Sequence, residues 1–172
     1  MSEKAELVGL RVLAHPLRLR ILSLLTGTAM SAAEAARELG ETQANVSYHL
    51  RRLHEAGLLV IAEEVRIQGG LAKRYRHVPG GSPPWDHDDP EAEQLFAATL
   101  ADELRRRTES RVPSGRSAIT DAEVWLAPAD WDRAVEVAHQ LGEILHAAAR
   151  PPRSPGTRRV SATVALFEMT RS

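Results

Sequence analysis

The sequence predicts an α+β fold, in which short helices and a β-hairpin occupy the first half and a long helix opens the second. Three observations support this class. Apolar residues recur at helical spacing through residues 3–57. Two strand-like runs, at residues 58–61 and 72–77, flank a glycine-containing turn at 68–70. Apolar residues make up 43% of the 172-residue chain, which is enough to form a buried core.

Two helices are expected at the start of the chain, over residues 3–13 and 16–26. His15 and Pro16 separate them, because proline fits the first position of a helix but interrupts one that is already running. Gly27 is the expected stop signal of the second helix. The apolar stripe of that helix consists of Leu17, Ile21, Leu24 and Leu25.

The next two helices have helix-turn-helix spacing. Ser31 and Glu34 match a capping box, so a helix should begin there and run to residue 39, before a glycine. Thr42 can cap the following helix, which ends at Gly57 and is expected to bury Val46, Leu50 and Leu53. Because a short glycine-containing turn joins the two helices and a hairpin follows directly, the order predicts a winged helix-turn-helix.

The second half is separated from the first by a linker rich in proline and glycine. We therefore divide the chain into a domain at 1–78, a linker at 79–89 and a second region at 90–172. That region should contain a long helix over 91–107, with Leu95, Phe96, Leu100 and Leu104 inward. A small α/β extension is expected after it, with strands at 122–126 and 158–167 around a helix at 128–149.

Charge is distributed unevenly. The net charge is −1, yet residues 1–78 hold 11 basic and 8 acidic side chains, whereas the rest of the chain holds 11 and 15. Arginine accounts for all but two of the basic residues, a bias typical of a GC-rich genome that also supplies donors suited to phosphate and guanine. Acid-free basic clusters lie at 42–54 and 66–77, as expected of a nucleic-acid-binding surface.

Composition also excludes several classes. The chain has no cysteine, so disulfides, thiolate metal sites and cysteine nucleophiles are absent. It has neither a signal-peptide pattern nor an apolar run long enough to cross a membrane. We therefore expect a soluble, cytoplasmic protein that does not associate with membranes.

The stretch from residue 10 to 78 contains three motifs in a fixed order: "LRVLAHPLRLRILSLL", "SAAEAARELGETQANVSYHLRRLHEAGLL" and "GGLAKRYRHV". With these motifs, it resembles the ArsR-like winged-helix transcriptional regulators of bacteria. The resemblance covers some two-fifths of the chain. It implies that the helix after Thr42 is the recognition helix for double-stranded DNA. It also implies a homodimer that pairs through the first helix and the helix at 91–107.

The expected DNA contacts lie on this helix and on the hairpin. Gln43 and Asn45 suit adenine edges in the major groove, whereas Ser47, Tyr48 and Arg52 suit the DNA backbone. Near the hairpin tip, phosphate or minor-groove contacts are expected from Arg66, Lys73 and Arg74. The full expected set also contains Thr42, His49, Arg51 and Arg76, and His49 has packing against the core as its alternative.

Metal and catalytic sites are not expected. His139, Glu143 and His146 share one helical face, but a solvent-facing polar edge explains that stripe equally well. The acidic run at 86–89 has metal-ligand residue types without a partner set. The chain lacks a phosphate-binding glycine loop and the common hydrolase motifs, so we expect neither a cofactor nor an enzyme.

The sequence thus predicts a homodimeric regulator that binds a pseudo-palindromic operator and represses transcription. Two alternatives remain. The winged helix could instead be a protein-interaction module that does not bind DNA. The region at 90–172 could be a sensor that binds an unidentified small-molecule effector.

Overall fold

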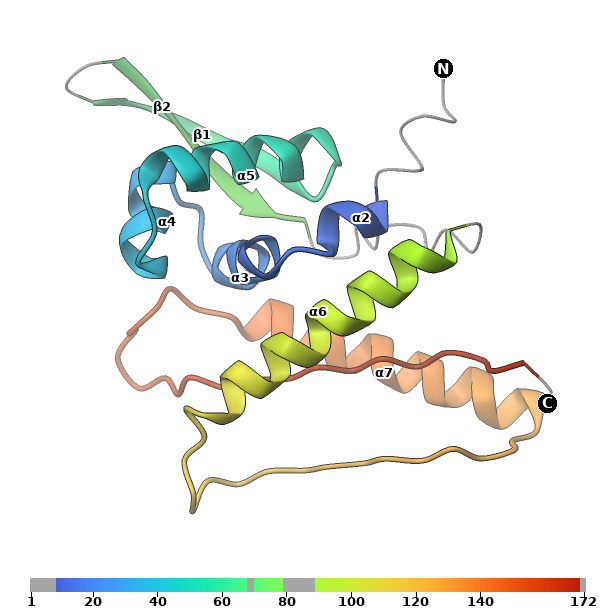
Figure 1. Ribbon diagram of the computed structural model, residues 1–172. Helices are drawn as coiled ribbons and strands as arrows, with labels where there is room; N and C mark the ends of the chain where they lie inside the picture. The colour runs from blue at the N-terminus through green and yellow to red at the C-terminus, as the bar shows by residue number, and fades with distance from the viewer. Residues whose placement is uncertain (1–8, 68–69, 79–88, 171–172) are drawn as a thin grey trace.

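The computed structural model describes residues 9–67, 70–78 and 89–170 (Figure 1). The start of the predicted first helix, part of the hairpin turn, residues 86–88 of the acidic run and most of the predicted linker lie outside these residues. The elements in chain order are α2 (Gly9–Leu13), α3 (Pro16–Leu25), α4 (Ala32–Leu39), α5 (Gln43–Glu55), β1 (Leu59–Ile67), β2 (Gly70–His77), α6 (Pro90–Thr108) and α7 (Pro128–Ala148).

The helix boundaries follow the local signals in the sequence. His15 caps α3, where its Nδ1 accepts a hydrogen bond from the backbone N–H of Leu17 at 3.2 Å. The capping box of α4 is confirmed: Ser31 Oγ accepts from the backbone of Glu34, and the Glu34 carboxylate accepts from the backbone of Ser31. Gly40 ends α4 with a φ of 68°, in the left-handed region that glycine tolerates best.

One hydrophobic core contains side chains from helices α2, α3, α4 and α5, from the hairpin and from α6. The largest fully buried side chains are Ile21, Leu25, Val46, Leu50, Leu53 and Leu59. The predicted stripes of α3 and α5 are therefore confirmed, except that Leu24 is only half-buried. Ala92 and Phe96 of α6 belong to the same core, which thus extends past the predicted boundary at residue 78.

The hairpin forms the wing of a winged helix-turn-helix, and the α+β class is confirmed. Strand β1 is longer than its apolar run, because it pairs antiparallel with β2 from Leu59 to Ile67, with an irregularity between Ile61 and Glu63. Tyr75 of β2 is buried and exchanges two backbone hydrogen bonds with Met30, at 3.0 and 2.9 Å. These bonds attach the base of the wing to the helical core.

Helix α6 has the expected length but a different buried face. Phe96 is buried and Leu100 half-buried, whereas Leu95 and Leu104 are exposed, contrary to the prediction. The buried positions Ala92, Phe96, Thr99 and Glu103 follow the helical period, and the two leucines lie beside that row. Glu103 is tolerated there because Arg106 donates to its carboxylate at 2.7 Å.

The predicted C-terminal strands are not formed. Residues 117–126 and 158–170 are extended and exposed, and α7 has no buried side chain. The predicted helix is confirmed, but the predicted sheet of the α/β extension is wrong for a single chain. Strand formation needs a hydrogen-bonded neighbour, and no described backbone group pairs with either segment.

The C-terminal end of α7 and the loop after it contact the winged helix at three points. The rings of His77 in β2 and His146 in α7 lie 5.5 Å apart. Arg153 forms an ion pair with Glu38 of α4. A Cβ on Gly27 would lie only 2.6 Å from the carbonyl oxygen of Arg150, so glycine is needed there for close approach.

The free energy of unfolding is expected to fall as the pH drops from about 6.5 to 4. Burial, and then the neighbouring His146, lower the pKa of His77 from 6.5 to about 4. The unfolded chain therefore binds a proton in this window that the folded chain does not, which favours unfolding. Denaturant titrations at several pH values should show a weaker pH dependence for His77→Asn. Exposed His139→Asn is the control, and equal slopes in both variants would contradict this role.

Candidate nucleic-acid interface

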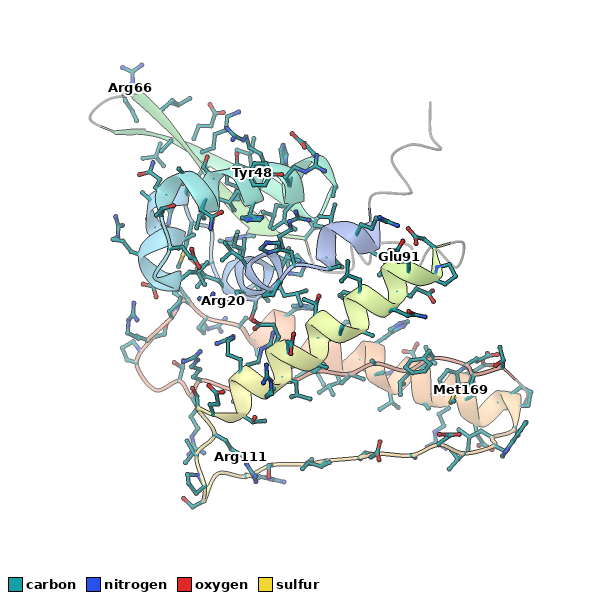
Figure 2. All side chains as sticks on the ribbon, viewed as in Figure 1. Arg20, Tyr48, Arg66, Glu91, Arg111 and Met169 are labelled. Carbon is teal, nitrogen blue, oxygen red and sulfur yellow. The ribbon has the colours of Figure 1, made fainter. Side chains whose placement is uncertain are left out.

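One exposed surface is formed by α5 and the wing, on the side of the molecule away from α6 and α7. Tyr48 on α5 and Arg66 at the wing tip both lie on this side (Figure 2). The first turn of α5 presents Gln43, Ala44 and Asn45 to solvent, while Val46 anchors the helix in the core. The exposed side chains of α5 also include Tyr48, Arg51 and Arg52, and Ser47 is half-buried.

The start of α5 is held in place by neighbouring polar contacts. Thr42 Oγ1 accepts a hydrogen bond from the backbone N–H of Asn45 at 3.3 Å and thereby caps the helix. Asn45 Nδ2 donates to Glu41 at 3.2 Å, and Arg20 lies 3.7 Å from the other oxygen of that carboxylate. Arg20 also donates to the carbonyl of Leu39 at 2.8 Å, so it ties α3 to the turn before α5.

His49 lies beneath α5 rather than on its exposed side. It is only 5% exposed, and its Nδ1 accepts from Arg18 Nε at 3.2 Å. Burial, and then His15 and Arg18, lower its pKa to about 4, so the ring is neutral near pH 7. Arg18 also donates to the carbonyl of Val12 at 2.8 Å. This placement supports the packing alternative for His49, and a DNA contact at this residue stays an untested prediction.

The wing carries exposed cations that have no acidic partner within 4 Å among the described residues. These are Arg66, Lys73 and Arg76, together with Arg51 on α5. Lys73 lies opposite Glu64 across the hairpin, which reduces the local positive charge beside it. Arg52 is exposed but pairs with Glu55 at 3.3 Å. The basic surface is therefore concentrated at the wing tip and the solvent side of α5.

Arg74 has a structural position that its sequence context does not reveal. Its guanidinium donates to Glu63 at 2.6 Å, to Glu34 at 3.1 Å and to the carbonyl of Ala29 at 2.7 Å. These acceptors come from the wing, from α4 and from the segment before α4. All three guanidinium nitrogens are thus engaged within the chain, which points to a structural role, and the phosphate contact of Arg74 stays a prediction.

Residues 13–62 match the family model of a helix-turn-helix domain. A search of curated proteins found no match to the chain. The matched residues run from the end of α2 into β1 and thus include the whole of α5. The helix-turn-helix domain supports a role in DNA-binding transcription regulation.

The histidine and acidic residues of the described ranges form no evident metal site. No group of three or more acidic, histidine or cysteine side chains there could hold a metal ion. No helix in those ranges is both long and apolar enough to span a membrane. The ring of His146, one of the residues on the polar stripe of α7, lies 5.5 Å from that of His77. The exposed surface of α5 and the wing, within and beside the matched domain, is the candidate functional site.

Sequence reasoning missed three residues that shape this surface. Arg18 donates a hydrogen bond to His49 beneath α5, Arg20 donates to the carbonyl of Leu39 in the turn before α5, and Glu41 accepts a hydrogen bond from Asn45. The HPLR run at 15–18 marks a helix start, but nothing in it indicates a hydrogen bond to residue 49. That contact depends on how α3 crosses α5.

Proposed function

We propose that this protein is a sequence-specific, double-stranded DNA-binding transcriptional repressor that acts as a homodimer. Helix α5 enters the major groove with Gln43 and Asn45 at the base edges. The wing tip reaches the flanking phosphates or the minor groove through Arg66 and Lys73. The observation that carries the proposal is that Tyr48 of α5 and Arg66 at the wing tip lie on the same side of the molecule (Figure 2), and that the first turn of α5 is exposed.

The other residues expected to contact DNA differ in their place on α5 and the wing, and this place decides the role proposed for each. Ser47, Tyr48, Arg51 and Arg52 lie further along α5 and suit the DNA backbone. Thr42 acts as the helix cap, and Arg76 supplies positive charge near the base of the wing. Residues 1–78 are thus the DNA-binding domain, and residues 90–172 provide dimerisation.

A homodimer follows from the small footprint of one recognition helix. Two copies related by a two-fold axis place two such helices about 34 Å apart, one turn of DNA, on a pseudo-palindrome. Helices α2 and α6 are one expected pairing surface, because Leu95 and Leu104 of α6 are exposed. Occupying a promoter in this way blocks transcription.

The test is fluorescence anisotropy of the purified protein with promoter fragments that flank its own gene, beside a scrambled duplex, over a range of salt concentrations. We expect a preference of about 10³-fold or more for one fragment and a steep fall of affinity with salt. Absence of binding to every duplex at low salt would contradict the proposal and favour a protein-interaction module.

A further inference from the structure

The C-terminal half contains two exposed apolar segments without backbone partners, residues 117–126 and 158–170. Six of their apolar side chains are 62–86% exposed: Ile119, Val124, Trp125, Val160, Phe167 and Met169. No backbone N–H or C=O in either segment forms a hydrogen bond within the described part of the chain. Each segment is therefore an extended stretch of chain (Figure 1) whose backbone groups are unpaired within the described residues.

Residues 160–167 lack the features that protect a free strand edge, whereas residues 117–126 carry the charged residues Asp121 and Glu123. Natural free edges usually carry lysine, proline or an inward-pointing charge, which prevent pairing with other chains. Residues 160–167 contain no charged residue and no proline, and residues 117–126 contain no proline. Such segments are expected to be paired in the working protein.

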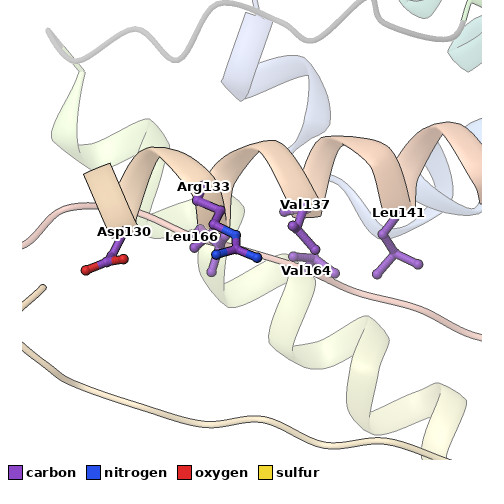
Figure 3. Close-up of a pocket in the computed structure, with 8 residues that line it drawn as sticks. Asp130, Arg133, Val137, Leu141, Val164 and Leu166 are labelled. Carbon is purple, nitrogen blue, oxygen red and sulfur yellow. The ribbon is translucent and has the colours of Figure 1, made fainter. Parts of the chain in front are cut away.

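Helix α7 adds an uncovered apolar face beside the 158–170 segment. Val137 and Leu141 of α7 and Val164 and Leu166 of the segment line a hollow of about 460 Å³ (Figure 3). Ala134 and Ala138 complete its apolar wall, and Asp130 and Arg133 also line it. Nothing in the described residues covers the open side of this hollow.

The contacts at the end of α7 hold this layer against the winged helix. Arg150 packs on Gly27, Arg153 pairs with Glu38, and His146 contacts His77. These residues come just before the 158–170 segment. The segment thus follows residues that are fixed against the winged helix, and it lies beside α7 with its backbone groups unpaired among the described residues.

We propose that a second copy of this chain covers this layer, with the 158–170 segment of each copy pairing with the 117–126 segment of the other. The resulting sheet spans the dimer and buries the apolar faces of both α7 helices. This inference deepens the proposed homodimer and adds an interface separate from α2 and α6.

A second copy fits because it supplies the required strands in equal number, as a two-fold axis demands. Charge favours pairing of the 117–126 segment with the 158–170 segment over pairing of 117–126 with itself. The 117–126 segment contains Asp121 and Glu123 without a basic residue, whereas the 158–170 segment begins with Arg158 and Arg159. Pairing of 117–126 with itself about Ala122 would place the two acids of each copy opposite one another, which is unfavourable.

The test combines hydrogen-exchange mass spectrometry with sedimentation equilibrium over a range of protein concentrations, without DNA. We expect a dimer in which peptides from both segments exchange at least about tenfold more slowly than in the dilute monomer. A monomer at all concentrations, an open-ended polymer, or a dimer with unprotected segments would each overturn the inference.

Phe167→Glu should weaken dimerisation by about tenfold or more and remove protection from both segments. The reason is that an aromatic side chain that the proposed dimer buries is replaced by a charge. The matched control is Leu71→Glu, at an apolar side chain of the wing that is 57% exposed. Equal dimerisation by both variants would contradict the proposed contact.

The two proposals fail in distinguishable ways. A dimer that binds the operator but leaves both segments unprotected overturns this interface and leaves the DNA-binding function standing. Protected segments in a dimer that binds no duplex support the interface and overturn the DNA-binding function.

Discussion

Replacing both Gln43 and Asn45 with alanine is expected to abolish most of the discrimination between the operator and a scrambled duplex. Each good bidentate contact with a base contributes about 1–3 kcal/mol, and both side chains lie exposed on the first turn of α5. Asn45 must exchange its hydrogen bond with Glu41 for one with a base, which gives it the smaller expected effect. Anisotropy with both duplexes measures the change.

Folding should be unaffected in this double variant, since neither side chain is buried. Its melting temperature should therefore match that of the unchanged protein, and its weak binding to the scrambled duplex should persist. Gln94→Ala, at an exposed position on α6, is the matched control and should leave operator affinity unchanged. Unchanged discrimination in the double variant would show that α5 reads no bases through these residues.

Replacing Arg74 with alanine is expected to destabilise the fold by about 1.5–3 kcal/mol, the range for charge-assisted hydrogen bonds. The side chain is only 28% exposed and connects the wing to Glu34 and to the carbonyl of Ala29. Without Arg74, both acceptors lose the hydrogen bond from its guanidinium, and the attachment of the wing to the helical core is weakened. Denaturant-induced unfolding, followed by circular dichroism, measures the effect.

Arg66→Ala is the matched comparison, because Arg66 is exposed at the wing tip and has no acidic partner among the described residues. It should leave stability unchanged but reduce the slope of log affinity against log salt by about 0.9, the value for one lost phosphate contact. The reverse outcome, with stability reduced by Arg66→Ala and the salt slope reduced by Arg74→Ala, would exchange the two roles.

The contrast between Arg66 and Arg74 shows where sequence reasoning stops. Both arginines lie in the same acid-free run of the wing, and both were predicted to contact DNA. The sequence does not place Glu34 and Glu63 beside one of them, because those acids lie 40 and 11 residues away. Glu63 reaches Arg74 only through the register of the hairpin, and Glu34 only when the wing packs on α4. An acid-free sequence window is therefore not an acid-free surface.

His49 and α6 show the same limit for burial. The helical period of α5 places His49 between the buried and the exposed face of the helix. The position of α3 then decides that Arg18 donates a hydrogen bond to the His49 ring beneath α5. In α6, several rows of apolar residues are compatible with the helical period. Contact with α2, including the ion pair of Arg11 with Asp89 at 2.8 Å, selects the row that contains Ala92 and Phe96.

Local signals in the sequence were enough to predict the approximate helix boundaries, the capping box, the glycine that ends α4, most of the core stripes of α3 and α5, and the helix-turn-helix order. These features depend on backbone hydrogen bonds and side-chain periodicity within a few residues. Long-range packing was needed to show which cations lack an acidic partner among the described residues and which face of α6 is buried. It also showed that residues 117–126 and 158–170 have no strand partner in the described part of the chain. Those outcomes depend on charges and backbone groups brought together from distant parts of the sequence.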